Sequence, residues 1–223
     1  MGFVVAIDGP AGSGKGTITK IVAEKRNLVA IDTGAMYRCV TLDCLNNGVS
    51  STNREGIEKI LENIKIEQKN ENGEKRFYLN GQDVSEKIRT PEVDSEVAKF
   101  AAIKPVRDKM TPLQREMGET QNIIMEGRDI GTVVFPNADV KIFLDCSLEE
   151  RANRRYKQNI EKGIQSTYEE ILESIKERHK LETERDIAPF IKAEDAIVVD
   201  STNLTIEEVV EEVLKIIDEK RGK

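Results

Sequence analysis

The segment that most constrains the fold of this chain is GPAGSGKGT, residues 9–17, which directly follows the apolar run from Phe3 to Ile7. Its glycines leave backbone N–H groups uncovered and permit positive φ, so such a loop can line a concave anion site with donors. Lys15 adds a positive charge, and the helical pattern that follows would aim its positive dipole end at the same anion. Strand, glycine loop and helix in this order predict a phosphate-binding loop.

The loop departs from the usual Walker A pattern at one position. Gly9, Gly14 and Lys15 have the expected spacing, but Gly16 stands where Ser or Thr would hold Mg²⁺, and the hydroxyl comes one residue later, at Thr17. The alternative interpretation is a glycine-rich turn with a solvated lysine. The strand before the loop and the helix after it favour phosphate binding.

Composition narrows the class of protein. The chain has 223 residues, which suits one domain, with or without insertions, and a sizeable core. We find no apolar run long enough to cross a membrane and no signal peptide, so we expect a cytoplasmic protein. The net charge of −7 disfavours nucleic acid as a partner, and three cysteines without a CxxC pair are interpreted as small buried side chains.

Two further loops follow predicted strands. DTGAMYR comes after the apolar run Leu28–Ile31, and EGRDIGT begins at the end of the run Ile123–Met125. Ligands of open α/β sheets bind at the carboxyl ends of strands, so we expect Thr33, Arg38 and the pair Arg128–Asp129 to face a ligand. The alternatives are a helix N-cap for Thr33, a surface charge for Arg38 and a structural pair for Arg128 and Asp129.

Between these loops the hydrophobic period changes from helical to alternating. Ile64 and Ile66 alternate with polar residues, Phe77 to Leu79 forms a second apolar run, and Asn72-Gly73 and Asn80-Gly81 are hairpin turn sequences. This pattern predicts a small antiparallel insert, which is either a substrate-side subdomain or an ornament.

Three arginines share one face of the helix that Ser147 and Glu150 begin as a capping box. Arg151, Arg154 and Arg155 lie at i, i+3 and i+4, where guanidinium groups could clamp phosphates. The alternative is a solvated face paired with glutamates. The charged region from residue 156 to 185 is expected to be a mobile cover, and its His179, the only histidine of the chain, is expected to be solvated.

The last two helices carry clear start signals. Thr167 with Glu170 and Thr205 with Glu208 are predicted capping boxes. The final helix is predicted to bury one stripe, made of Ile206, Val209, Val210, Val213, Leu214 and Ile217.

Taken together, GPAGSGKGT, DTGAMYR, EGRDIGTVVFP and the arginine helix resemble the bacterial cytidylate kinases of the P-loop nucleoside monophosphate kinase superfamily. The resemblance extends over nearly the whole chain. It implies an α/β fold: a three-layer P-loop core with a mainly parallel sheet, a small antiparallel substrate insert and a helical lid. It further implies one kinase domain over residues 1–223, with a nucleoside monophosphate insert at 36–100 and a lid at 151–186.

The resemblance also implies the activity and the site. ATP with Mg²⁺ would phosphorylate CMP and dCMP in a monomer that binds neither nucleic acid nor membranes. ATP would be bound by Gly9, Pro10, Ala11, Gly12, Ser13, Gly14, Lys15, Gly16, Thr17, Arg151 and Arg155, with Thr17 near the metal. The acceptor would be bound by Thr33, Tyr37, Arg38, Arg107, Arg128, Asp129, Arg178 and Arg185. The residues acting on the transferred group would be Lys15, Arg128, Arg154 and Arg178.

The chain departs from the family pattern at four positions. Glu126 replaces a common Asp, Ala98 stands where a small hydroxyl residue is expected near the base, and Leu181-Glu182 replaces an Arg–Asp pair near the ribose. A kinase of another small molecule, such as UMP, AMP, shikimate or dephospho-coenzyme A, would share the first loop but not DTGAMYR and GRDIGT. A nucleotide switch would need an NKxD motif, which is absent, and the acidic balance makes a nucleic-acid-binding module the weakest alternative.

Overall fold

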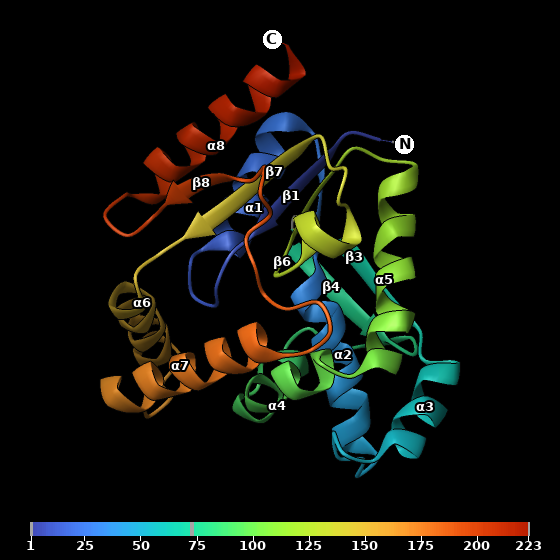
Figure 1. Cartoon of the computed structure of the whole chain (residues 1–223). Helices are drawn as coiled ribbons and strands as arrows, with labels where there is room; N and C mark the ends of the chain where they lie inside the picture. The colour runs from blue at the N-terminus through green and yellow to red at the C-terminus, as the bar shows by residue number, and fades with distance from the viewer. Residues whose placement is uncertain (1, 72–73, 223) are drawn as a thin grey trace. The chain divides into compact units, whose positions relative to one another are not determined.

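The computed structural model describes residues 2–71 and 74–222 (Figure 1). The chain separates into two compact units, Met1–Ala30 with Met117–Lys223, and Ile31–Glu116. The predicted organisation, one domain with an insert at 36–100 and a lid at 151–186, stays a prediction.

The first unit is built on a parallel sheet. Its strand order is β2-β6-β1-β7-β8, and the pairs β1–β6, β1–β7 and β7–β8 are parallel. The strands are β1 Val4–Asp8, β2 Val29–Asp32, β6 Ile123–Gly127, β7 Val140–Asp145 and β8 Ile197–Asp200. Every residue of β1 and β6 is buried, as expected for central strands covered on both faces. The α/β fold with a mainly parallel sheet is therefore confirmed.

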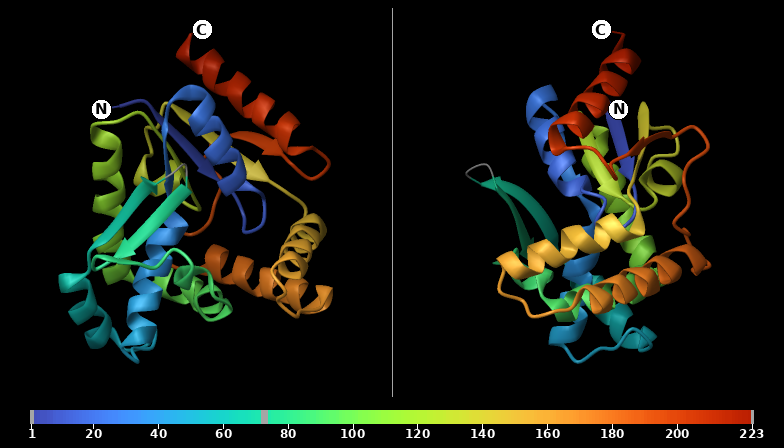
Figure 2. Two further views of the ribbon diagram at one scale, coloured as in Figure 1. Left: turned by 180° about the vertical axis from the view of Figure 1, so that it is seen from behind. Right: turned by 90° about the vertical axis from the view of Figure 1, so that its left-hand side faces the viewer.

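Helices α1 (Lys15–Arg26) and α8 (Ile206–Arg221) cover one face of this sheet, as Figure 2 shows from behind. Side chains of both helices join β1 in one apolar core, which includes Val22, Val213 and Ile217. The predicted stripe of α8 is wrong at its first member, because Ile206 is 48% exposed in the first turn and Ile216 is buried instead.

Helices α6 (Leu148–Glu161) and α7 (Tyr168–Glu184) pack against each other around Ala152, Ile171 and Ile175. The capping boxes at Thr167 and Thr205 are both formed, as predicted. The capping box predicted at the start of α6 is only half formed. The Ser147 hydroxyl accepts a hydrogen bond from the Glu150 amide, but the Glu150 carboxylate accepts one from Arg154. A short helical turn, η2 (Ile130–Val134), follows β6.

The second unit contains the predicted antiparallel insert, in the order β3-β4-β5. Its elements are β3 Ile66–Glu71, β4 Glu74–Leu79, β5 Gln82–Asp83, α2 Thr33–Asn46, α3 Arg54–Asn63, η1 Lys87–Arg89, α4 Pro91–Ala101 and α5 Lys104–Glu119, which begins in this unit. Asn80 and Gly81 both have positive φ, as the predicted turn requires. The other predicted turn, Asn72-Gly73, lies outside the described residues.

Candidate active site

The glycine segment forms a loop between β1 and α1 in which several glycines are needed. Gly12 and Gly14 have φ of 82° and 92°, a region that side chains with a Cβ disfavour. At Gly9 a Cβ would stand 2.2 Å from the carbonyl oxygen of Leu144, so only glycine fits. The loop therefore has the backbone conformation that the sequence predicts for phosphate binding.

Lys15 is buried and folded back over this loop. Its Nζ donates hydrogen bonds to the carbonyl oxygens of Gly9 and Pro10, both at 2.8 Å, and to Ser13 Oγ at 3.4 Å. Burial lowers the pKa of Lys15, as does the nearby charge of Arg128, while the charges of Glu126 and Glu182 act in the opposite direction. A bound anion would raise the pKa of Lys15 again, because it favours the charged form of the lysine.

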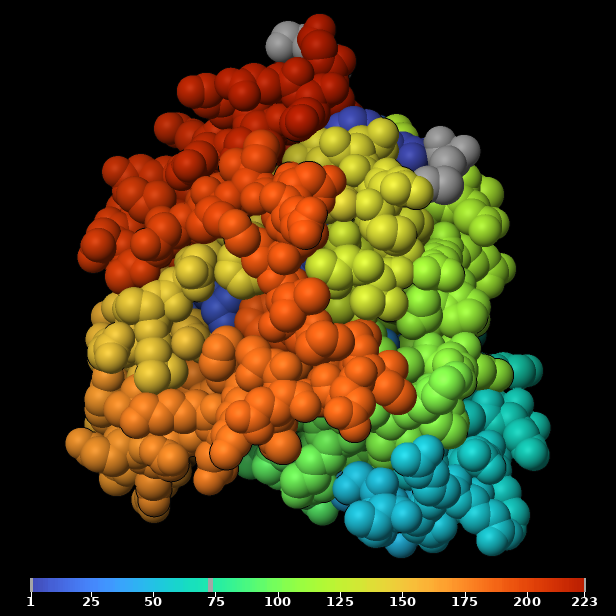
Figure 3. Space-filling view, in the orientation of Figure 1, coloured from blue at the N-terminus to red at the C-terminus, as the bar shows by residue number. Residues whose placement is uncertain are grey.

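Two arginines of α6 donate hydrogen bonds to backbone carbonyl oxygens of the phosphate-binding loop. Arg151 is buried and donates to the carbonyl oxygens of Cys146 at 3.1 Å and Ala11 at 3.4 Å. Arg154 donates to the carbonyl oxygens of Ser13 at 3.4 Å and Ser201 at 2.6 Å. The alternative of a solvated face paired with glutamates holds in part, because Arg154 Nε also donates to Glu150 Oε1 at 3.0 Å, but both arginines in addition contact the backbone of the loop. In Figure 3 a small blue patch of the N-terminal segment is visible in a recess between the yellow and orange surfaces of this region.

Arg155, the third arginine of that face, is half-buried. Thr17 is exposed in the first turn of α1. Its position near a metal ion, which the family resemblance implies, stays a prediction.

The loop after β6 carries Arg128 and Asp129 and is attached to β1. The carboxylate of Asp8, at the end of β1, accepts hydrogen bonds from the amides of Ile130 at 2.8 Å and Gly131 at 2.7 Å. Burial raises the pKa of Asp8 to about 6, although these two amides act in the opposite direction. The sequence does not predict a role for Asp8, because the two amides that it binds belong to residues more than a hundred positions away.

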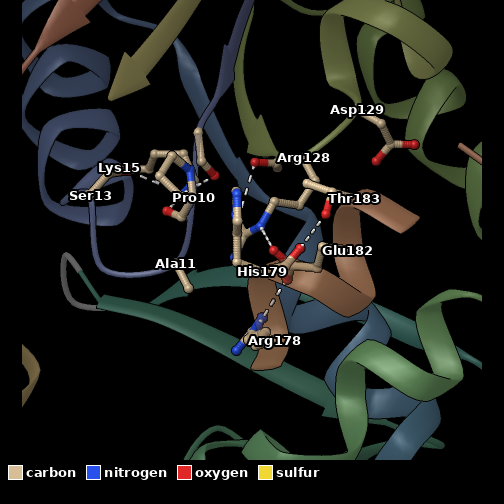
Figure 4. A network of polar contacts seen from close by, with 12 residues as sticks. Pro10, Ala11, Ser13, Lys15, Arg128, Asp129, Arg178, His179, Glu182 and Thr183 are labelled. Carbon is tan, nitrogen blue, oxygen red and sulfur yellow. Dashed lines mark hydrogen bonds and ion pairs between the residues drawn. The ribbon is translucent and has the colours of Figure 1, made fainter. Parts of the chain in front are cut away.

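A cluster of charges joins this loop to α7. Arg128 Nε donates to Glu182 Oε2 at 2.8 Å, and Arg178 Nε donates to Glu182 Oε1 at 2.9 Å (Figure 4). Arg185, directly after α7, lies 3.9 Å from Asp129. The structure therefore brings two predicted residues, Arg128 and Arg178, together at the carboxylate of Glu182, and it pairs two others, Arg185 and Asp129, with each other. In the sequence, Glu182 stands out only as a departure from the family pattern. Its spacing of four residues from Arg178 is the signal that could have indicated the pair.

The second unit holds the other predicted acceptor residues. Thr33 and Tyr37 are buried in α2, where Asp32 is the N-cap, so the alternative of Thr33 as a cap is wrong. Arg38 donates to the carbonyl oxygen of Ile88 at 3.2 Å and pairs with Asp94, so it is more than a loose surface charge.

Arg107 of α5 is buried in the same unit as Tyr37. It donates to the carbonyl oxygen of Ala101 at 3.0 Å, and its guanidinium carbon lies 5.4 Å from the centre of the Tyr37 ring. Ala98 is also buried. Backbone and ring contacts of this kind hold a guanidinium in one orientation, which recognition of a planar base requires.

Two further predictions concern the cysteines and the histidine. Cys39, Cys44 and Cys146 are free and buried, as expected. His179 is exposed and its ring lies edge-on to Phe190 at 5.8 Å. Within residues 2–71 and 74–222, none of the helices is long and apolar enough to cross a membrane.

A parallel sheet with a glycine loop after its central strand, and a lysine at the start of the next helix, defines a P-loop α/β protein. Among solved structures, a shikimate kinase from Acinetobacter baumannii in complex with shikimate is similar with a TM-score of 0.50 and 15% identity. That match covers 100% of this chain and 97% of the other. At this identity the likeness concerns the fold alone.

The sequence comparisons are more specific. A family model described as cytidylate kinase matches residues 5–219. The cytidylate kinases of Fusobacterium nucleatum and Thermosipho melanesiensis are 50% and 51% identical over 216 residues, covering 97% of this chain and 97% of each relative. That of Bacillus subtilis is 45% identical over 216 residues, covering 97% of this chain and 96% of the relative. The chain therefore belongs to the cytidylate kinase family, and it is an enzyme, a kinase.

Proposed function

We propose that this enzyme transfers the γ-phosphoryl group of ATP to CMP and dCMP, giving ADP and CDP or dCDP. The observation that carries the proposal is the family match over residues 5–219, which includes every residue of the candidate site. The positions of Lys15 in a phosphate loop and of four arginines on α6, α7 and the loop after β6 support a reaction between polyanions.

The proposed mechanism needs no protein base. The acceptor is a phosphate monoester with a second pKa of about 6, so at pH 7 most of it is already a dianion. The enzyme must instead hold the attacking and leaving oxygens in line and neutralise charge on the moving phosphoryl group. In our assignment, the amides of residues 9–17 and Lys15 bind the ATP phosphates, with Arg151 and Arg155 beside them. Arg128, Arg154 and Arg178 stabilise the transferred group.

The acceptor is assigned to the remaining predicted residues. Arg38 and Arg185 would bind the phosphate of CMP. Thr33 and Tyr37 would contact the nucleoside, and Arg107 with Asp129 would recognise the edge of cytosine. The hydrogen bond from Arg107 to the Ala101 carbonyl limits the orientation of the guanidinium group. This supports the assignment of Arg107 to recognition of the cytosine edge.

The residues present fit a Mg²⁺ ion. Within residues 2–71 and 74–222 no group of three or more His, Cys, Asp or Glu side chains could hold a metal ion by itself. Mg²⁺ is commonly bound by one or two protein oxygens together with substrate phosphates. Thr17 would hold it, and so would Glu126, whose Oε1 stands 3.5 Å from where a Cβ of Gly16 would lie. When bound, Mg²⁺ neutralises charge on the phosphate oxygens.

The experiment that tests the proposal is ADP release from ATP and Mg²⁺, measured in parallel with CMP, dCMP, UMP, AMP and no acceptor. We expect release to depend on CMP or dCMP and to be well below that level with the other acceptors. Release favouring UMP or AMP would assign the enzyme to another nucleotide, and release without an acceptor would indicate a hydrolase. A cytoplasmic monomer that binds no nucleic acid stays a prediction, and light scattering would test its oligomeric state.

A further inference from the structure

We propose that Glu182 is a positioning residue that orients Arg128 and Arg178 for phosphoryl transfer; this inference rests on the proposed function. Glu182 is 4% exposed and lies between the two arginines, with one carboxylate oxygen for each (Figure 4). The arginines come from different parts of the chain, the loop after β6 and helix α7. One side chain therefore fixes two cations that the sequence alone does not place together.

The guanidinium atoms that contact Glu182 are suited to fixing the orientation of the two arginines. Both hydrogen bonds to Glu182 come from Nε, at 2.8 Å for Arg128 and 2.9 Å for Arg178. A guanidinium has five N–H donors in one plane, so a contact through Nε fixes that plane and directs the terminal Nη donors to other partners. A phosphate can then accept from Nη donors of both arginines while Glu182 stays in place, although Nη1 of Arg128 also donates to the carbonyl oxygen of Gly127 at 3.3 Å.

The other neighbours of Arg128 hold it in the same orientation. Its guanidinium carbon lies 5.8 Å from the centre of the Phe190 ring, and the Phe190 amide donates to the Glu182 carbonyl oxygen at 2.8 Å. The segment after α7 is therefore folded back onto Glu182. It supplies an aromatic ring beside the cation that Glu182 binds.

Charge explains why the position needs a carboxylate. Two guanidinium groups that meet at one buried point repel each other unless an anion lies between them. With Glu182 ionised, the three groups carry one net positive charge, which still attracts a phosphate. Burial by itself would raise the pKa of Glu182, but the charges and hydrogen bonds of Arg128 and Arg178 hold it well below its usual range. The carboxylate is thus ionised wherever a kinase is assayed.

The cluster also attaches the end of α7 to the loop after β6. Arg178 and Glu182 are spaced i and i+4 on α7, and Arg185 is the first residue after the helix. Arg185 lies 3.9 Å from Asp129, the residue after Arg128. Two neighbouring loop residues are therefore paired with the last turn of α7 and the residue that follows it. A displacement of Glu182 would move both Arg128 and Arg178 relative to the transferred group.

The test compares wild type with Glu182→Gln, Glu182→Asp and the control Glu177→Gln, an exposed glutamate on the same helix. We expect Glu182→Gln to lower kcat about 100-fold, the cost of displacing reacting groups by roughly 1 Å, with KM for ATP changed much less. Glu182→Asp keeps the carboxylate and should recover part of the loss, with equal effects on CMP and dCMP. Glu177→Gln should have wild-type kinetics.

Several results would overturn the inference. These are wild-type kcat in Glu182→Gln, no recovery in Glu182→Asp, or a loss seen with CMP but not dCMP, which would indicate a sugar contact instead. If wild type itself lacks CMP-dependent transfer, the proposed function fails, which is a different outcome from any of these. Thermal melts of each variant separate a kinetic loss from unfolding.

A measurement on the wild-type protein keeps the inference testable if Glu182→Gln does not fold. Arginine Nε–H signals can be followed by ¹H–¹⁵N NMR and assigned with Arg128→Lys and Arg178→Lys. We expect both signals to be protected from exchange, and to stay protected when CMP, Mg²⁺ and a non-hydrolysable ATP analogue are added. Loss of protection on addition would overturn the inference, because Glu182 would then be displaced by phosphate.

Discussion

The ammonium group of Lys15 donates a hydrogen bond of 2.8 Å to the carbonyl oxygen of Gly9, the first residue of its own loop. A second bond of the same length reaches Pro10. The lysine thus satisfies its donors inside the loop, in a buried position that lowers its pKa. A polyphosphate offers stronger, charged acceptors, so we infer that nucleotide binding turns the side chain from the loop carbonyls to the anion.

Lys15→Ala should lower kcat by about 100- to 1,000-fold, the usual cost of removing one donor to a developing oxyanion. The fold should persist, because the three lost bonds to the loop are worth about 1 kcal/mol each. Steady-state ADP release and a thermal melt measure the two effects. Lys20→Ala, an exposed lysine on the same helix, is the control. Near-normal turnover in Lys15→Ala would remove this residue from the assigned site.

Arg151 should matter for both the phosphate loop and stability. Arg151→Ala removes the bonds to Cys146 and Ala11 from a buried side chain, so we expect a loss of about 2 kcal/mol in the free energy of unfolding. The KM for ATP should rise about tenfold because the phosphate-binding loop loses the hydrogen bond from Arg151 to the Ala11 carbonyl. Urea unfolding and ATP titrations measure these effects, with the exposed Lys157→Ala as the control. An unchanged KM with lowered stability would leave Arg151 a structural residue only.

The parts of the site that the sequence predicts best are those that local chemistry determines. The loop 9–17 has the predicted conformation because its glycines and the following helix lie within one short segment. The capping boxes at Thr167 and Thr205 form between partners three residues apart, whereas at Ser147 the Glu150 carboxylate bonds Arg154 instead of closing the box. The antiparallel insert likewise follows from alternation and the turn at Asn80-Gly81.

What the sequence could not provide are contacts between distant segments. Arg128 and Glu182 are 54 residues apart, and Asp8 and Ile130 are 122 apart. No periodicity marks these pairs, since packing of the parallel sheet and of α7 brings them together. Ile206 shows that spacing alone can also mislead. It has the spacing of the buried stripe of α8, but it lies in the first turn of the helix, outside the apolar core, and is exposed.

Arg107→Lys should raise the KM for CMP about 10- to 100-fold, since a lost bidentate contact to a base is worth about 1–3 kcal/mol. Lysine keeps the charge but cannot reproduce the planar fork that lies near Tyr37 and is bonded to the Ala101 carbonyl. The KM for ATP should change little. Steady-state kinetics with CMP and UMP measure the effect, and Lys104→Gln on the same helix is the control. Equal losses for ATP and CMP would contradict a role in base recognition.

The ion pairs of Glu182 should also affect how the free energy of unfolding depends on pH. The pKa of Glu182 in the folded protein lies below its ordinary value of 4.5, since Arg128 and Arg178 outweigh the effect of burial. The carboxylate therefore stabilises the fold fully above pH 4.5, and this contribution is lost as the pH falls toward the folded pKa. Glu182→Gln lacks it at every pH.

We therefore expect wild type to exceed Glu182→Gln in stability by about 3 kcal/mol at pH 7, the cost of breaking a buried ion pair. For a chain of this size that corresponds to a difference in Tm of roughly 10 °C. The difference should stay constant from pH 8 to about pH 5 and narrow below pH 4.5, where the wild-type carboxylate begins to lose its advantage. Melting curves of both proteins across this range measure it, with Glu177→Gln as the control. A difference that grows on acidification would have the wrong sign for an ionised, paired Glu182.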